Sequence, residues 1–136
     1  MNDCLFCKII SKEEPCFLVY EDDKFLAILD VHPVNPGHTL VMPKEHSRHL
    51  LDASEETVCG LMATTRRVAA AITQALGLDA FNLEMNCGPI AGQVIPHLHL
   101  HIVPRRAEDH LKHWPGKVYA AGEADQLAEK IKKALG

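Results

Sequence analysis

The sequence lacks the features that mark membrane, secreted and nucleic-acid-binding proteins. No segment approaches the roughly 20 apolar residues of a membrane span. Residues 1–4 carry no basic stretch followed by an apolar run, as a secretory signal would. Lys and Arg number 14 against 18 Asp and Glu, so no basic excess is available to neutralise a nucleic-acid backbone. We therefore expect a cytoplasmic protein that has neither a membrane nor a nucleic acid as its partner.

Repeats, low-complexity tracts and linkers are also missing, so the 136 residues fit a single domain over residues 1–136. Apolar residues make up 47% of the chain, enough for one packed core. The five cysteines are an odd number, and without a signal peptide they indicate reduced thiols or metal ligands rather than a disulfide framework. Cys16, Cys59 and Cys87 are expected in or near the core.

Apolar periodicity predicts an α+β fold with an antiparallel sheet of about five strands, one main helix and a C-terminal helix. A hairpin is expected over residues 16–20 and 25–29, with further strands over residues 39–42, 81–85 and 97–103. The main helix starts after Ser54, an N-cap residue, and ends at Gly77; the last helix covers residues 123–135. The strands come first, so the helices are expected on one face of the sheet.

Three histidines alternate with apolar residues in the most informative stretch, His97-Leu98-His99-Leu100-His101. Successive side chains on a strand point to opposite faces, so the histidines form a row opposite the core. The row is a solvated face, a metal site or a catalytic site. The outer two Cα atoms are about 13 Å apart, which strains a three-histidine zinc site, although His97 and His99 alone could bind one ion. A neutral imidazole with one nitrogen held by a hydrogen bond is a good nucleophile toward phosphorus.

Residues 91–105, with this row at their centre, resemble the signature of the histidine triad (HIT) family, His-φ-His-φ-His-φ-φ with φ apolar. Residues 30–44 and 4–9 are similar to the family's upstream blocks, so the resemblance covers nearly the whole chain. It implies a homodimer that hydrolyses or transfers nucleoside monophosphates. The main helix would then present its Ala-rich side to the other subunit. Residues 113–116 also resemble a family segment that lies near the partner's site.

The resemblance assigns roles residue by residue. His99 would attack the α-phosphate, the backbone carbonyl of His97 would hold its other ring nitrogen, and His101 would bond a phosphate oxygen. The remaining substrate-binding positions are Ile28, Asp30, Val31, His38, Asn86 and Gln93. Among these, Asp30 would accept the ribose hydroxyls. Residues 94–96 lack the Ser or Thr hydroxyl of some relatives, which leaves the preference for the leaving group open.

The pair Cys4 and Cys7 lies before the first strand, where a thioredoxin-like redox pair is not expected. The resemblance supplies His46 and His97 as two further ligands of a closed structural zinc site. His49 is an alternative to His46, and two thiols without metal are an alternative to the site. No catalytic metal is required.

These observations favour a purine nucleoside phosphoramidase that acts through a nucleotidyl-histidine intermediate. A dinucleoside polyphosphate hydrolase with the same nucleophile is the nearest alternative. A nucleotide- or zinc-binding interaction module without turnover, and a zinc hydrolase that uses His97 and His99 as ligands, are the others. Arg105 and Arg106 are expected to be a solvated pair.

Overall fold

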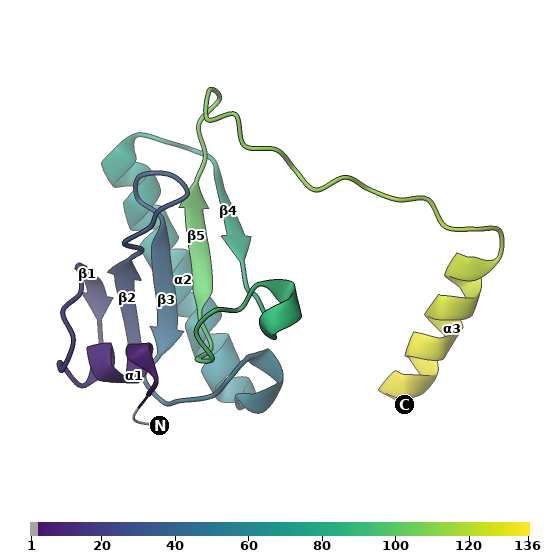
Figure 1. The fold of residues 1–136 in the computed structure, drawn as a ribbon, viewed down its shortest axis with the longest axis horizontal. Coiled ribbons are helices and arrows are strands. Elements are labelled where there is room, and N and C mark those ends of the chain that lie inside the picture. Colours follow the sequence, from purple (N-terminus) through teal and green to yellow (C-terminus); the bar gives the residue numbers. More distant parts are fainter. Residues whose placement is uncertain (1–2) are drawn as a thin grey trace.

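The computed structural model describes residues 3–136 and contains one five-stranded antiparallel sheet with the strand order β1-β2-β3-β5-β4 (Figure 1). The strands are β1 (Leu18–Glu21), β2 (Phe25–Leu29), β3 (Thr39–Pro43), β4 (Phe81–Glu84) and β5 (Leu100–Pro104). The hairpin of β1 and β2 and the α+β class are as the sequence predicts. β4 lies at one edge and pairs with β5.

Within residues 3–136 the α-helices are α1 (Leu5–Ile10), α2 (Glu55–Leu76) and α3 (Glu123–Leu135), and 3-10 turns occupy η1 (Leu50–Asp52) and η2 (Pro89–Ala91). α2 begins where predicted: the Ser54 hydroxyl accepts a hydrogen bond from the Thr57 N–H at 3.1 Å. It ends at Gly77, which has a φ of 65° and so adopts a left-handed conformation that glycine tolerates. α1 was not predicted, because its six residues are too few to show a helical period.

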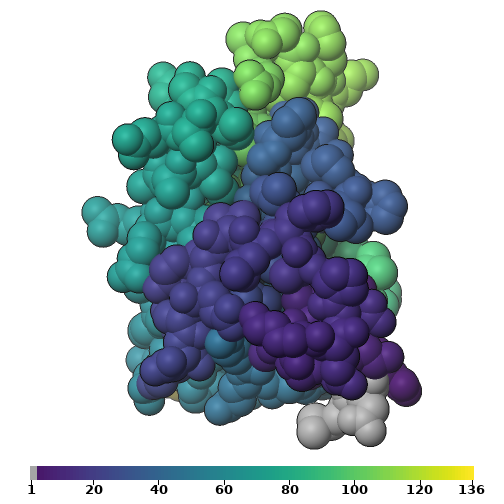
Figure 2. Space-filling view, turned by 90° about the vertical axis from the view of Figure 1, so that its left-hand side faces the viewer, coloured from purple at the N-terminus to yellow at the C-terminus, as the bar shows by residue number. Residues whose placement is uncertain are grey.

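The sheet is covered on both faces, so the expectation that all helices share one face is wrong. α2 packs on one face, on a cluster that includes Ala27, Val41 and Leu100. α1 packs on the other, where Phe6 and Ile9 meet Leu26, Ile28, Leu40 and Met42. Figure 2 shows the molecule from the β1 edge, with the N-terminal residues (purple) facing the viewer and the region of α2 (teal) on the left.

The histidine row has the predicted alternation but only part of the predicted strand. β5 begins at Leu100, because the Leu98 N–H bonds the carbonyl of Ser47 in a loop. Leu98, Leu100 and Ile102 still face α2, and the histidines face the α1 side. His97 is 0% exposed, His99 is 6% exposed and His101 is half-buried, so the row is not a solvated face.

The opposite edge of the sheet is open. Phe81 and Leu83 alternate with polar residues along β4, a pattern that predicts one buried face, but they are 40% and 43% exposed. Every residue from His110 to Gly136 is exposed, including all of α3. Two of the three cysteines expected in or near the core lie further out, since Cys59 and Cys87 are exposed. Cys16 is half-buried and packs against the core cluster on the α1 side, as expected.

Arg105 is engaged rather than solvated. Its Nε donates to the Asp109 carboxylate at 2.7 Å, and the same carboxylate accepts the Arg106 N–H at 3.0 Å. This ion pair with Arg105 holds the pKa of Asp109 well below its usual range. The chain is therefore fixed just before its exposed C-terminal segment. Among the described helices, none combines the length and the apolar character needed to cross a membrane.

Candidate active site

Most of the predicted substrate-binding residues meet around one cavity of about 340 Å³ on the α1 side of the sheet. The predicted residues that line it are Ile28, Asp30, Val31, Asn86, His99 and His101. They come from the end of β2, the segment after β4 and the histidine row, which the antiparallel pairing brings together. The antiparallel sheet therefore assembles a site from positions up to 73 residues apart.

His99 has one ring nitrogen held and one available. Its Nδ1 lies 2.6 Å from the carbonyl oxygen of His97, which can only accept, so the proton is on Nδ1 and Nε2 carries the lone pair. The Phe6 ring packs edge-on against the imidazole, with a centroid distance of 5.0 Å. Burial lowers the pKa of His99 from its usual 6.5, which keeps the ring neutral.

A chain of hydrogen bonds sets the protonation of His101. The Val34 N–H donates to His38 Nδ1 at 3.0 Å, so His38 carries its proton on Nε2. That nitrogen lies 2.9 Å from His101 Nδ1, which therefore accepts, and His101 Nε2 is left as a donor. Burial lowers the pKa of both imidazoles, which keeps the pair neutral.

Asp30 follows β2 at the mouth of the cavity. Its Oδ1 accepts the His32 N–H at 2.9 Å, and its Oδ2 lies 3.5 Å from His38 Nε2. The carboxylate is thereby fixed in direction while one oxygen remains close to the histidines. A fixed carboxylate beside a cavity is a suitable acceptor for neighbouring hydroxyl groups.

Gln93 does not reach the cavity, although it was predicted to bind substrate. Its Oε1 accepts the Gly88 N–H at 2.8 Å, and its Nε2 donates to the Arg48 carbonyl at 2.6 Å. The side chain therefore stabilises the glycine-rich loop and holds it to the segment before η1. Asn86 lines the cavity and also donates to the Gly92 carbonyl at 3.4 Å.

The apolar wall of the cavity contains residues that the sequence did not single out. Leu5, Phe6 and Ile9 of α1 contribute one side, and Cys16, Val94 and Ile95 contribute to the rest. The sequence offered no signal for the three α1 residues, because a six-residue helix is too short to show a helical period. A mostly apolar wall of this kind suits an aromatic ring system better than a charged group.

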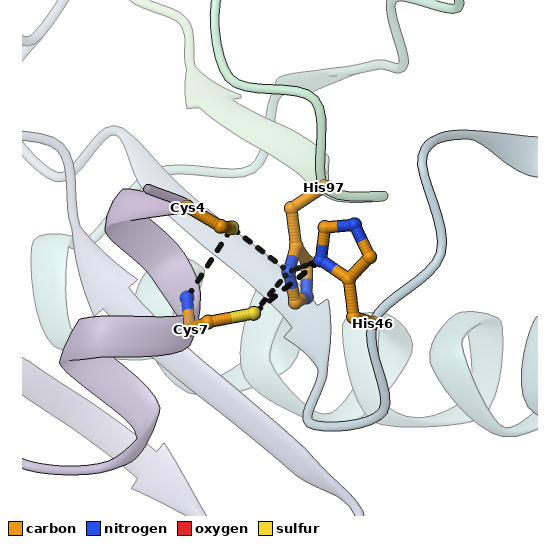
Figure 3. A group of neighbouring side chains, drawn as sticks. All are labelled: Cys4, Cys7, His46 and His97. Atoms are coloured by element: carbon orange, nitrogen blue, oxygen red, sulfur yellow. Dashed lines mark hydrogen bonds between the residues drawn. The ribbon is translucent and has the colours of Figure 1, made fainter. Parts of the chain in front are cut away.

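A second group of side chains lies on the other side of His99. Cys4, the N-cap residue of α1, and Cys7 within α1 point toward His46 and His97 (Figure 3), and one ligand atom from each lies within 4.8 Å of the others. The Nδ1 atom of His97 is 3.5 Å from Cys4 Sγ and 3.7 Å from Cys7 Sγ, and His46 Nδ1 is 3.3 Å from Cys7 Sγ. The four atoms thus surround one point.

These separations fit a tetrahedral metal site. Bonds of about 2.0–2.3 Å from one ion to nitrogen and sulfur place neighbouring ligand atoms about 3.3–3.8 Å apart. The His97 ring is fixed from behind by a 2.8 Å contact between its Nε2 and the Pro43 carbonyl. Burial and the neighbouring Cys4 raise the pKa of Cys7 to about 11, so the thiol keeps its proton unless a cation is bound.

Two of the alternatives do not fit this geometry. His49 lies outside the cluster, and its Nδ1 accepts the Leu51 N–H at 3.3 Å at the start of η1. A zinc hydrolase that uses His97 and His99 together is also excluded by the contacts, because both ring nitrogens of His97 are already directed at the cluster and at Pro43.

Comparison with protein families matches residues 11–108 to the HIT domain. The chain is 46% identical to the adenylylsulfatase HINT3 of Arabidopsis thaliana over 98% of this chain and 70% of that protein. It is 34% identical to the adenosine 5'-monophosphoramidase hnt1 of Schizosaccharomyces pombe over 97% of this chain and 98% of that protein.

Solved structures with the same fold cover almost the whole chain. The crystal structure of SMU.412c from Streptococcus mutans has a TM-score of 0.94 at 39% identity and covers 100% of this chain and 87% of that one. A structure described as a Zn-bound histidine triad family protein from Mycobacterium smegmatis has a TM-score of 0.78 at 38% identity, over 98% of both chains.

Proposed function

The chain belongs to the HIT domain family, and on that premise we propose that it is a nucleotide hydrolase in which His99 attacks the α-phosphate of a nucleotidyl donor. The observation that carries this proposal is the 2.6 Å hydrogen bond from His99 to the His97 carbonyl, which leaves Nε2 with a free lone pair beside the cavity. A binding module has no need for a neutral imidazole oriented in this way.

The reaction proceeds in two displacements. His99 Nε2 forms a bond to phosphorus, and the bond from phosphorus to the leaving group breaks with its electron pair on the leaving group. An amine leaving group takes up a proton from solvent, which the attacking water later returns. His101 Nε2–H donates a hydrogen bond to the phosphate and stabilises the charge that develops there. Water then attacks the nucleotidyl-histidine, the P–N bond breaks, the water's proton passes to solvent, and a nucleoside monophosphate is released.

The substrate proposed is a purine nucleoside phosphoramidate or a related adenylyl donor. The apolar wall from α1 suits a nucleobase, and the fixed Asp30 carboxylate suits the ribose hydroxyls. The names of the Arabidopsis and fission yeast relatives, an adenylylsulfatase and an adenosine 5'-monophosphoramidase, support a donor of this class. A dinucleoside polyphosphate is the second candidate, because the same nucleophile serves a different leaving group.

Zinc is the ion proposed for the group of Cys4, Cys7, His46 and His97. Two thiols and two imidazoles are a donor set that zinc prefers, and the mycobacterial relative was solved with zinc bound. With an ion bound, Cys4 and Cys7 at the start of α1 would be held to His97 in the segment that carries His99. The proposed role of the ion is structural, so His97 contributes its ring to the metal and its carbonyl to the nucleophile.

A panel of three donors tests the proposed function. We expect wild-type protein to hydrolyse adenosine 5'-phosphoramidate, adenylylsulfate and diadenosine tetraphosphate to AMP. The kcat/KM for the phosphoramidate is expected to be at least about 10-fold higher than that for the tetraphosphate, a difference of roughly 1.4 kcal/mol in transition-state stabilisation. A reversed order would favour the polyphosphate hydrolase. No turnover of any donor by zinc-loaded protein that still binds AMP would favour the binding module.

The lowered pKa of His99 predicts the acid side of the pH profile. Nε2 attacks only while it is unprotonated, so kcat/KM falls as pH drops through the pKa of the imidazole. Because burial lowers that pKa below 6.5, we expect the half-maximal kcat/KM for adenylylsulfate to lie below pH 6.5. A half-maximal rate at or above pH 6.5 would contradict the proposed environment of His99.

The partners proposed are a small molecule that contains a nucleoside monophosphate and, from family resemblance, a second copy of the chain.

A further inference from the structure

Cys4 and Cys7 supply the sulfur ligands of the proposed metal group, and they also form a close pair of thiols. Their Sγ atoms lie within 4.8 Å of each other, and both cysteines are free (Figure 3). The Cys7 N–H donates to Cys4 Sγ at 3.4 Å, which holds the Cys4 sulfur over the first turn of α1. Residues three apart on a helical turn are neighbours, so a local movement of this turn is enough to join the two sulfurs in a disulfide.

The two thiols differ in their access to solvent. Cys7 is half-buried, whereas Cys4 is 7% exposed and belongs to the core cluster on the α1 side. A small oxidant therefore reaches the Cys7 sulfur first, and the Cys4 sulfur lies behind it. An accessible sulfur beside a second, resolving sulfur is the arrangement of a redox-sensitive cysteine pair.

The two residues between the cysteines both belong to the wall of the cavity. Leu5 and Phe6 line it, and the Phe6 ring packs edge-on against His97 and His99 with centroid distances of 5.9 and 5.0 Å. A disulfide between the cysteines would enclose Leu5 and Phe6 in one covalent ring. Closing that ring moves the first turn of α1 and with it the part of the wall that contacts the histidines.

A disulfide would also change the surroundings of His97. Its Nδ1 lies 3.5 Å from Cys4 Sγ and 3.7 Å from Cys7 Sγ. A disulfide sulfur has no thiolate charge with which to bind a cation, so the metal group would lose both of its anionic ligands. Because the His97 carbonyl holds His99 at 2.6 Å, a displacement of His97 reaches the proposed nucleophile directly.

We propose that Cys4 and Cys7 form a reversible disulfide in the presence of a peroxide, and that this disulfide expels the bound cation and distorts the cavity. The effect on the cation rests on the proposed metal site, and the effect on turnover rests on the proposed function. The disulfide itself depends on neither, so it can be measured separately.

The oxidation passes two electrons from the pair of sulfurs to one peroxide molecule. Sulfurs that bind a cation are thiolates, which is their nucleophilic form. The Cys7 sulfur attacks one peroxide oxygen, the O–O bond breaks, and the departing hydroxide takes a proton from solvent to become water. The Cys4 sulfur then attacks the Cys7 sulfur, the S–O bond breaks, and a second hydroxide becomes water in the same way.

The size of the ring makes this disulfide easy to reverse. It closes a loop of only the four residues from Cys4 to Cys7, and a loop this short restricts the unfolded chain little. Disulfides that are strained or exposed are the ones that thiols reduce readily. A thiol reductant is therefore expected to reopen the pair and to restore the metal ligands.

Peroxide treatment of zinc-loaded protein tests the proposal. The protein used is Cys59→Ser/Cys87→Ser, which lacks two exposed thiols outside the cavity and the metal group. We expect hydrogen peroxide to release about one zinc per chain, and mass spectrometry after alkylation to identify a Cys4–Cys7 disulfide. The kcat/KM for adenosine 5'-phosphoramidate is expected to fall at least about 10-fold, and dithiothreitol with zinc to restore it to within about 2-fold.

Cys7→Ser in the same background is the matched control, since it cannot form the pair. Its kcat/KM is expected to change by less than about 2-fold on peroxide treatment, relative to its own untreated value. Zinc content and AMP formation before treatment report on the metal site and on the hydrolase, independently of the disulfide. The proposal is overturned if the pair stays open to alkylation, if the disulfide joins Cys16 instead, or if a Cys4–Cys7 disulfide leaves zinc bound and turnover unchanged.

Discussion

His99→Ala is expected to lower kcat for adenosine 5'-phosphoramidate by about 10⁴-fold or more, because it removes the only proposed nucleophile. Without that nucleophile, water must attack phosphorus directly, and the reaction loses the two-step path through a covalent intermediate. The cavity wall formed by α1 and the Asp30 carboxylate remains in place, so AMP is expected to bind the variant within about 10-fold of wild type.

The intermediate itself provides a second readout. Wild type mixed with a donor labelled at the α-phosphate and quenched within milliseconds is expected to carry the label on one histidine, and His99→Ala is expected to carry none. His49→Ala is the matched control, since it removes a histidine outside both the cavity and the metal cluster and should retain both turnover and label. Labelling of the His99→Ala chain, or a loss of activity below about 10-fold, would assign the nucleophile elsewhere.

Loss of the proposed zinc site is expected to have the largest effect on stability. Cys7→Ser removes a ligand in contact with both His46 and His97, and it should abolish stoichiometric zinc and lower Tm by about 10 °C or more. The reason is that the ion would join α1 to the loop after β3 and to the segment before β5, three parts of the chain that are distant in sequence. Metal analysis and thermal unfolding measure the two effects.

Cys59→Ser is the control for the metal prediction, because Cys59 is an exposed thiol outside the cluster. It should keep one zinc per chain and change Tm by at most about 2 °C. Chelated wild type should behave as Cys7→Ser does, and zinc should restore it. Protein purified without chelator that has no zinc, and that takes up none when zinc is added, would remove the metal from the proposal.

The parts of the fold that could be predicted are those where a local pattern decides the structure. Ser54 and Gly77 mark the ends of α2 because their side chain and backbone conformation act within one turn. The position of α1 could not be predicted, since a six-residue helix is stabilised by the packing of Phe6 and Ile9 on a sheet that forms elsewhere in the chain. The same applies to β4, where alternation predicts a buried face but the face lies open.

The residues of the site, like the elements of the fold, could be predicted where a local pattern determines their position and could not where a distant partner does. The alternation of the histidines was enough to put His99 and His101 on one face, and that face is where the structure has them. Gln93 was misplaced, because the direction of its amide depends on the carbonyl of Arg48, a partner 45 residues away. Long-range contacts of this kind leave no periodic signal in the sequence.

The hydrogen bond from the Val34 N–H to His38 Nδ1 makes the protonation of the histidine pair independent of the side chain at position 34. The sequence of donors that ends at His101 starts at the main-chain N–H of Val34, and 19 of the 20 genetically encoded residues would supply the same group. The exposed side chain of residue 34 can therefore be substituted without changing which ring nitrogen of His38 and of His101 carries the proton. The backbone path of residues 31–38 therefore determines that His101 Nε2 is the nitrogen that donates a hydrogen bond to the substrate. Only proline at position 34 would remove this control, because it has no main-chain N–H.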